Sequence, residues 1–331
     1  MSDGGLVARV LGAVGDVPAQ AWDALAGEGN PFVSHAFLTA LEDSGSVGPG
    51  SGWQPAPIVI EDGAGHLLGV LPSYVKGHSQ GEYVFDHAWA DAWQRAGGRY
   101  YPKFQIAAPF TPATGPRLLL ADDAFAPPLL SAAEQVCTGN GFSSAHATFV
   151  DPAQLPLFEA AGWLPRSDIQ FHWFNRDYRT FDDFLAQLSA RKRKTIRKER
   201  EGARAGLDDK VLLMLALEEG VPIAGALNFV GADTLYGRYW GCTREVRFLH
   251  FELCYYQAIE AAIERGLARV EAGAQGPHKL ARGYQPVETW SAHWIADPGF
   301  RDAVADFLQR ERAGIAVDRE WLAGRTPFKR G

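Results

Sequence analysis

The chain has 331 residues, of which 47% are hydrophobic, and its net charge at pH 7 is −7. These values exclude a disordered chain, fit two domains, and argue against a protein whose surface binds DNA. The three cysteines include no CxxC pair, so we expect neither a disulfide framework nor a metal site. Residues 1–12 lack a signal-peptide pattern, and no apolar run reaches the roughly 18 residues that span a membrane. We therefore expect a cytoplasmic protein without a membrane span.

Short strands and helices alternate through the first half, separated by turns rich in Gly, Pro and Asp. Strands are expected at residues 6–11, 56–60, 66–75, 82–85, 99–108, 142–150 and 170–175. Helices are expected at residues 17–26, 34–43, 88–96, 124–137 and 151–161. The Asp62-Gly63 dipeptide predicts a hairpin between two of these strands.

A second unit begins at Thr180, which caps a helix expected to continue to about residue 206. Strands are expected at 211–217, 221–230, 234–241, 268–272 and 289–295, and helices at 251–265 and 302–312. Strand, helix and strand over 234–272 predict a crossover between two parallel strands. The order of elements is similar in both halves, so we expect an α/β fold of mixed sheets with domains at 1–168 and 169–331.

The carboxyl ends of the two parallel strands are the expected functional site, because ligands of open α/β sheets bind there. The residues near these ends that we expect to bind substrate are Arg238, Trp240, His250, Gln275, Lys279 and Arg282. Glu271 lies late in its strand, where desolvation would raise its pKa, and His278 follows in a glycine-rich loop. Either could take a proton from an attacking amine while backbone N–H groups stabilise the oxyanion. The alternative is a flexible surface loop over 272–284.

A basic run at residues 191–200 contains seven Arg and Lys residues and one Glu. On a helix, Arg193 and Arg197 share one face with Arg200 and Arg204, and Lys194 lies on a neighbouring face. Such a face could hold the phosphates of tRNA, of a nucleotide-linked sugar or of CoA. The alternative is a solvated helix paired with the acidic remainder of the protein.

The first half offers a second candidate surface around an irregular strand and a proline-rich turn. Tyr101 and Lys103 lie on the strand, and the turn follows at residues 109–116. Irregular turns often carry function. We expect this region to bind the acceptor.

Several strings resemble the FemAB-like peptidoglycan biosynthesis/recognition proteins of bacteria, which are placed in the GNAT-related acyltransferase superfamily. They include NPFVSHAFLTALEDSGSVG, RYYPKFQIAAPFTPATGPRLL, LSARKRKTIRKERE, LYGRYWGC, HFELCYYQAIE and EAGAQGPHKLARGY. The resemblance implies two GNAT-like halves and N-acyl or aminoacyl transfer to an amine in cell-wall precursor metabolism. It also implies an acyl-CoA or aminoacyl-tRNA donor, with no metal and no tightly bound cofactor.

Two features depart from this pattern. GNAT enzymes that use acetyl-CoA usually carry a glycine-rich turn after the fourth strand, whereas residues 242–250 (CTREVRFLH) contain no glycine. The link at 204–210 is also shorter than in similar proteins. Two other functions therefore stay open: an acetyl-CoA-dependent N-acetyltransferase that acts on a small amine, and a non-catalytic binder of cell-wall precursors or RNA.

Overall fold

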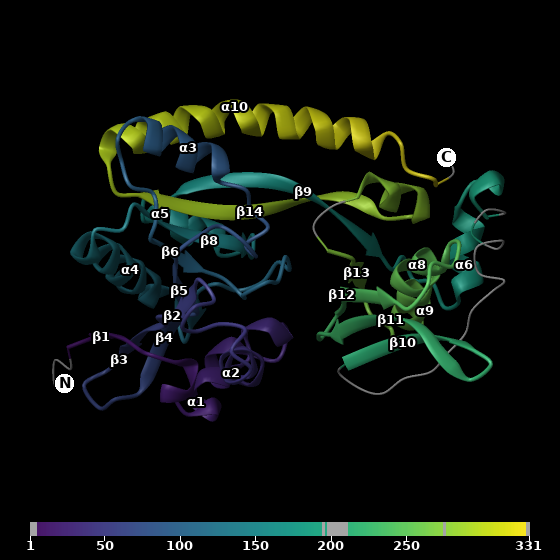
Figure 1. The fold of residues 1–331 in the computed structure, drawn as a ribbon, viewed down its shortest axis with the longest axis horizontal. Helices are drawn as coiled ribbons and strands as arrows, with labels where there is room; N and C mark the ends of the chain where they lie inside the picture. Colours follow the sequence, from purple (N-terminus) through teal and green to yellow (C-terminus); the bar gives the residue numbers. More distant parts are fainter. Residues whose placement is uncertain (1–4, 194–195, 197–210, 274–275, 329–331) are drawn as a thin grey trace. The chain divides into compact units, whose positions relative to one another are not determined.

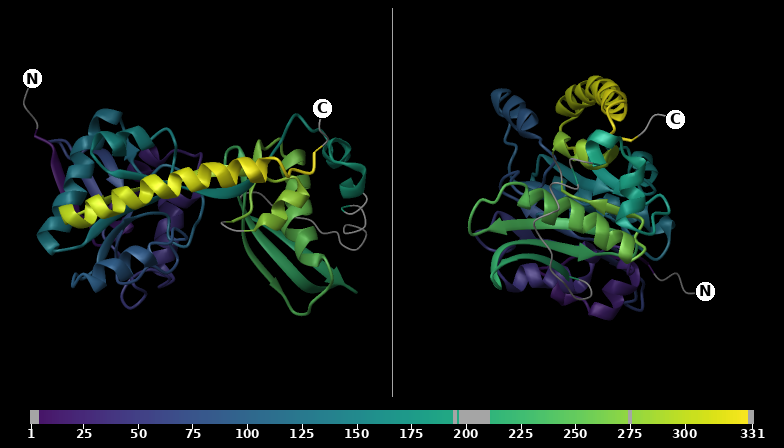
Figure 2. Two further views of the ribbon diagram at one scale, coloured as in Figure 1. Left: turned by 90° about the horizontal axis from the view of Figure 1, so that it is seen from above. Right: turned by 90° about the vertical axis from the view of Figure 1, so that its right-hand side faces the viewer.

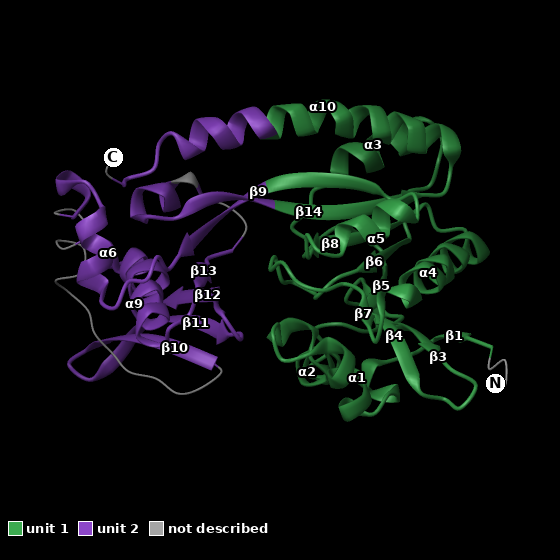
Figure 3. Cartoon of the chain, turned by 180° about the vertical axis from the view of Figure 1, so that it is seen from behind, with its two compact units in different colours: residues 1–168, 289–315 green, residues 169–288, 316–331 purple. Residues whose placement is uncertain are grey.

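A computed structural model describes residues 5–193, 196, 211–273 and 276–328 (Figure 1). The chain divides into two compact units, each built from two segments (Figure 3). Unit 1 comprises residues 1–168 and 289–315, and unit 2 comprises residues 169–288 and 316–331. The elements that start in one unit and end in the other are Leu164–Phe174 (β9), Gln285–Ile295 (β14) and Pro298–Ala323 (α10).

Unit 1 contains strands of two sheets and the helices that cover them. One sheet is antiparallel, in the order β1-β3-β4-β7, and consists of Val7–Val10 (β1), Ile58–Glu61 (β3), Leu67–Leu71 (β4) and Leu119–Leu120 (β7). The other has the order β14-β8-β6-β5-β2 and includes Trp53–Pro55 (β2), Ser73–Lys76 (β5), Lys103–Ile106 (β6) and Ser144–Val150 (β8). The helices are Ala19–Ala26 (α1), His35–Asp43 (α2), His87–Arg95 (α3), Ala126–Asn140 (α4) and Leu155–Ala160 (α5).

The larger sheet of unit 1 has one apolar and one polar face, and both are buried. Phe104 and Ile106 alternate along β6 with Lys103 and Gln105, and all four side chains are buried. The apolar face packs in one hydrophobic cluster with α4. Since β6 and β8 are parallel and α4 joins them, unit 1 contains a strand–helix–strand crossover.

Residues 289–315 belong to unit 1, although the sequence analysis placed them in the second domain. β14 pairs with β8 from Trp290 to Ile295. Phe300, Val304 and Leu308, on the first turns of α10, are buried in one cluster with Trp89 of α3 and Tyr100. This 26-residue helix is drawn in yellow in Figures 1 and 2, and it is longer than the expected 302–312.

Unit 2 contains a sheet in the order β10-β11-β12-β13-β9. Its other strands are Val211–Glu218 (β10), Val221–Val230 (β11), Thr234–Cys242 (β12) and Arg269–Glu271 (β13). Its helical segments are Phe181–Gln187 (α6), Leu249–Phe251 (α8), a π-helical turn at Glu252–Tyr256, Gln257–Glu264 (α9) and a 3-10 helix at Pro277–Arg282. The expected crossover is confirmed, since β12 and β13 pair in parallel and α9 lies between them in sequence.

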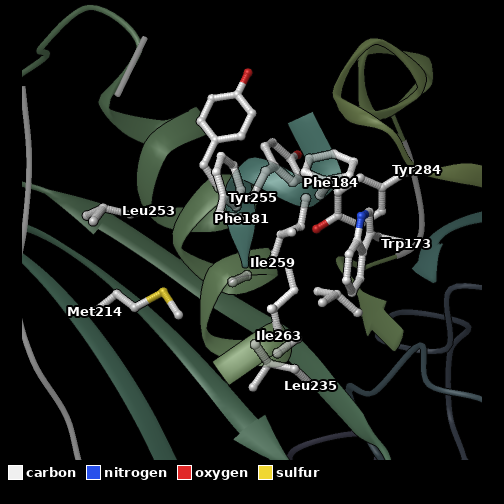
Figure 4. Close-up of a cluster of buried hydrophobic side chains, with 14 of the residues drawn as sticks. Trp173, Phe181, Phe184, Met214, Leu235, Leu253, Tyr255, Ile259, Ile263 and Tyr284 are labelled. Carbon is white, nitrogen blue, oxygen red and sulfur yellow. The ribbon is translucent and has the colours of Figure 1, made fainter. Parts of the chain in front are cut away.

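The core of unit 2 lies between this sheet and α9. Ile259 and Ile263 project from α9 toward Leu235 of β12, and Trp173 of β9 packs in the same cluster (Figure 4). Their spacing of four residues is the one that places helical side chains on a single face. The apolar pattern that predicted this helix therefore also identifies its buried side.

Three local predictions differ from the structure. The helix capped by Thr180 ends at Gln187, because Leu188 adopts an extended backbone, and the predicted continuation over 197–206 lies outside the described residues. The expected strand at 82–85 is irregular, and Glu82 turns inward to an ion pair with Lys103. β6 is shorter than the expected 99–108. Over the residues that the structure describes, no helix has the length and apolarity needed to cross a membrane.

Candidate functional site

The two parallel strands of unit 2 separate at their carboxyl ends. They pair only from Thr234 to Tyr236 on β12, and β13 ends at Glu271 while β12 continues to Cys242. The pairing of β12 with β11 also shifts by one residue, so that Arg238 forms a bulge between Gly237 and Tyr239. A bulge bends its strand and increases the local twist. The sequence thus opens the sheet at the place where the crossover predicts a ligand site.

A pocket of about 130 Å³ occupies this opening. Its lining consists of Ala226, Leu227, Asn228, Gly237, Arg238, Tyr239, Trp240, His250, Cys254, Tyr255, Ala272 and Gly273. A Cβ atom at Gly237 would lie 3.4 Å from Asn228 Oδ1 and 3.6 Å from the Ala272 Cα atom. A side chain at Gly237 would therefore pack in ordinary van der Waals contact at the point where the two strands part.

The π-helical turn at Glu252–Tyr256 forms another side of the pocket and supplies Cys254 and Tyr255. A π turn contains an extra residue, which changes the direction of the side chains in it, and such turns are frequent at functional sites. Phe248, just before α8, has a left-handed backbone with φ of 69°. Both irregularities lie in the segment that joins β12 to α9.

Aromatic and histidine rings form a continuous wall beside the pocket. The rings of Trp240 and His250 lie 5.3 Å apart, and those of His250 and Tyr255 lie 5.5 Å apart. The Tyr255 hydroxyl is 2.9 Å from His278 Nε2. This hydrogen bond places one of the two proposed bases next to a residue that lines the pocket.

Two buried cations lie behind this wall. The Lys279 ammonium donates to the Gly273 carbonyl at 2.9 Å, and burial lowers the pKa of Lys279 to about 8. Arg282 donates to the His278 carbonyl at 2.8 Å. Burial, and then the positive charges of Arg282 and Lys279, lower the pKa of both His250 and His278. Both histidines are therefore neutral at pH 7, and a neutral imidazole can accept a proton.

Glu271 is buried and is not among the residues that line the pocket. Its Oε1 atom lies 3.8 Å from His172 Nδ1 and 3.6 Å from Arg269 Nε. His172 is its partner on β9, and burial, aided by Arg269 and Lys279, lowers the pKa of His172 to about 3. The contact of His172 with Glu271 could not be predicted from the sequence, because only the pairing of β13 with β9 brings the two residues together.

Arg193 is described, but it makes contacts elsewhere in unit 2. Its guanidinium donates to the Leu188 carbonyl at 2.9 Å, close to the end of α6. Lys194, Arg197 and Gln275 lie outside the described residues. The phosphate-binding role expected for the basic run therefore stays a prediction.

Tyr101 and Lys103 belong to unit 1. Lys103 is fully buried, and its ammonium lies 2.7 Å from Glu82 Oε2 and also forms an ion pair with Asp86. The Tyr101 hydroxyl forms a 2.8 Å hydrogen bond with Ser79. The sequence analysis expected Lys103 on an acceptor-binding surface; it lies instead inside an ionic cluster, because strand alternation turns it toward the buried polar face.

A family model described as FemAB-like, peptidoglycan biosynthesis/recognition, matches residues 13–207 and 201–330. Among solved structures, the fold is similar to that of FemX, with 11% identity over 87% of this chain and 98% of FemX and a TM-score of 0.54. A tandem GNAT protein from the clavulanic acid biosynthesis pathway matches with 14% identity over 89% of this chain and 99% of that chain and a TM-score of 0.43. A search of curated proteins gave no match. The likeness to FemX, together with the two-segment family match, confirms the expected fold of two GNAT-like halves.

Proposed function

The chain belongs to the FemAB-like family of peptidoglycan biosynthesis/recognition proteins, and we propose that it transfers an acyl or aminoacyl group to an amine. The observation that carries this proposal is the pocket at the separated ends of β12 and β13. Backbone groups beyond Tyr236 on β12 do not pair with β13, so this edge of the strand faces the pocket. N–H groups fixed in this way can stabilise the oxyanion of an acyl-transfer intermediate.

The proposed reaction has one bond-forming and one bond-breaking step. The amine nitrogen attacks the acyl carbon, and the bond from that carbon to the oxygen or sulfur of the donor then breaks. His278 accepts the proton that the amine loses, because it is neutral and next to Tyr255 at the pocket. Glu271 supports β13 and His172 from behind the pocket, and we propose a positioning role for it.

We propose an aminoacyl-tRNA donor ahead of acyl-CoA. The segment after β12 lacks the glycines that would let backbone N–H groups surround a pyrophosphate. Arg244 in this segment forms an ion pair with Glu218 of β10 instead. Both donors occur in the cytoplasm, which is where we place the reaction.

The decisive experiment is a transfer assay with charged tRNA and, separately, with acetyl-CoA. We expect turnover with charged tRNA, and we expect His278→Ala to reduce it by about 10²- to 10⁴-fold, which is the usual contribution of a general base. Glu271→Gln should have a smaller effect, and Arg265→Gln, an exposed change after α9, should have none.

Two results would contradict the proposal. Turnover by the His278→Ala variant at the wild-type rate would show that His278 is not the general base. Absence of transfer, together with no change in melting temperature with either donor, would favour a binding protein over a transferase, since a ligand at 100 times its Kd stabilises by about 2.7 kcal/mol.

A further inference from the structure

Lys279 is a buried cation without an acidic partner in the described part of the chain. The residue is only 1% exposed, and the hydrogen bond of its ammonium goes to the Gly273 carbonyl. No ion pair of Lys279 occurs among the described residues. Leaving a buried charge uncompensated is strongly unfavourable, so natural proteins rarely keep one without a function.

Three further groups with positive or potentially positive charge lie close to Lys279. Arg282 is 8% exposed, and its guanidinium lies 3.5 Å from the centre of the Phe251 ring. Both Arg282 and Lys279 act on His250 and on His278, and in each case they oppose protonation. The positive charges of Lys279 and Arg282 therefore disfavour the protonated form of both imidazoles, and an anion bound among the four side chains would offset this effect.

The cluster borders the pocket directly. His250, Tyr255 and Gly273 line the pocket, and they contact the cluster through the hydrogen bonds from Tyr255 to His278 and from Lys279 to Gly273. A ligand that fills the pocket would therefore lie against residues that contact Lys279 and His278.

We propose that Lys279, Arg282, His250 and His278 form an anion-binding subsite, which takes a phosphate or carboxylate group of the substrate beside the reacting acyl group. The position beside the reacting acyl group rests on the proposed function, whereas the anion subsite itself does not. Arg and Lys are the side chains that bind such groups most strongly, through charge-assisted hydrogen bonds.

The position of this subsite restricts the substrate. His278, Lys279 and Arg282 lie on the 3-10 helix after β13, whereas His250 lies on α8, just before the π turn. The anionic group therefore belongs to the part of the substrate that lies at the β13 side of the pocket. A phosphate of the donor and a carboxylate of the acceptor share this chemistry, and the choice of probe distinguishes them.

The test is an NMR titration of His250 and His278 in the whole protein, in chloride alone, with added inorganic phosphate and with added acetate. Bound anion stabilises the protonated imidazoles, so we expect the pKa of both histidines to rise by about 0.5 or more with the preferred anion. Lys279→Met should weaken the apparent affinity for that anion at least about tenfold, whereas Arg265→Gln should leave it unchanged. A larger response to phosphate indicates a phosphate-bearing substrate, and a larger response to acetate indicates a carboxylate.

The proposal fails if neither anion moves the two titrations, or if Lys279→Met responds as the wild type does. This readout involves no turnover. An active transferase without an anion response would therefore refute the subsite alone, and an anion response in a protein that shows no transfer would refute the proposed function alone.

Discussion

Lys103 in unit 1 and Lys279 in unit 2 are both almost completely buried, but their surroundings are opposite in charge. Burial acts to lower the pKa of Lys103, yet Glu82 and Asp86 outweigh it and raise that pKa above its usual value. Lys279 has no such partners among the described residues, and burial lowers its pKa to about 8. The charge of Lys103 is thus balanced by neighbouring carboxylates, whereas that of Lys279 has no balancing carboxylate among the described residues.

The ends of the parallel strands show the same contrast. In unit 1, the chain leaves β6 after Ile106, and the following residues Ala107, Ala108 and Ala113 are buried. The buried Arg117 side chain donates to the Thr148 and Ala113 carbonyls, at 2.7 and 2.8 Å. The protein's own side chains and backbone thus fill this region, whereas a pocket lies at the corresponding strand ends of unit 2. The same crossover topology therefore leads to buried side chains in one unit and to a pocket in the other.

The largest expected effect is that of Lys103→Met. This change removes the cation and leaves Glu82 and Asp86 buried together, so we expect the free energy of unfolding to fall by about 3–5 kcal/mol. Urea denaturation measures this loss. The matched variant Lys103→Met/Glu82→Gln/Asp86→Asn removes these three charges and leaves Lys76, whose pKa burial lowers to about 7, so that it can become neutral. This variant should recover most of the stability. A loss below about 1 kcal/mol in the single variant would show that this cluster does not depend on charge balance.

Lys279→Met should change the free energy of unfolding in the opposite direction and increase it. The pKa of Lys279 in the folded protein is about 8, below the usual 10.5. The buried charge therefore lowers the free energy of unfolding most strongly below pH 8. This destabilisation disappears as the pH rises from 8 toward 10.5. We therefore expect the variant to be more stable than the wild type by about 1–3 kcal/mol at pH 6.5. The difference should shrink between pH 8 and pH 10, which urea denaturation at several pH values can follow. A destabilised variant at pH 6.5 would contradict the unpaired state of this lysine.

The fold of unit 2 could be predicted where local signals agree with the final packing. The helical spacing of Ile259 and Ile263 and the position of Gly266 place the crossover helix correctly. The assignment of residues 289–315 could not be predicted, because β14 and α10 continue the chain after unit 2 but pack in unit 1. Sequence order contains no signal for such a return to the first unit.

The lining of the candidate pocket, like the fold of unit 2, could be predicted in part from the sequence. Arg238, Trp240 and His250 line the pocket as the end-of-strand argument expects, since that argument needs only the order of the strands. The place of Tyr255 in the pocket lining depends on the π turn, and the position of His172 depends on the pairing of β9 with β13. Neither is encoded in a local pattern. The surroundings of Lys103 could not be predicted for the same reason, because Glu82 lies in a loop that was expected to be a strand and Asp86 lies just before α3.

The smallest expected effect is the difference in stability loss between removing the hydroxyl group of Tyr100 and removing that of Tyr255. The Tyr100 hydroxyl donates to Asp86 at 2.7 Å, whereas the Tyr255 hydroxyl contacts the neutral His278 at 2.9 Å. Hydrogen bonds to charged groups contribute more than those between neutral groups, so Tyr100→Phe should cost about 1.5–3 kcal/mol and Tyr255→Phe about 0.5–1.5 kcal/mol. Urea denaturation of both variants at pH 7 tests this order. Equal losses would mean that Asp86 is neutral in the folded protein, and the ionic balance that separates unit 1 from unit 2 would then rest on Glu82 alone.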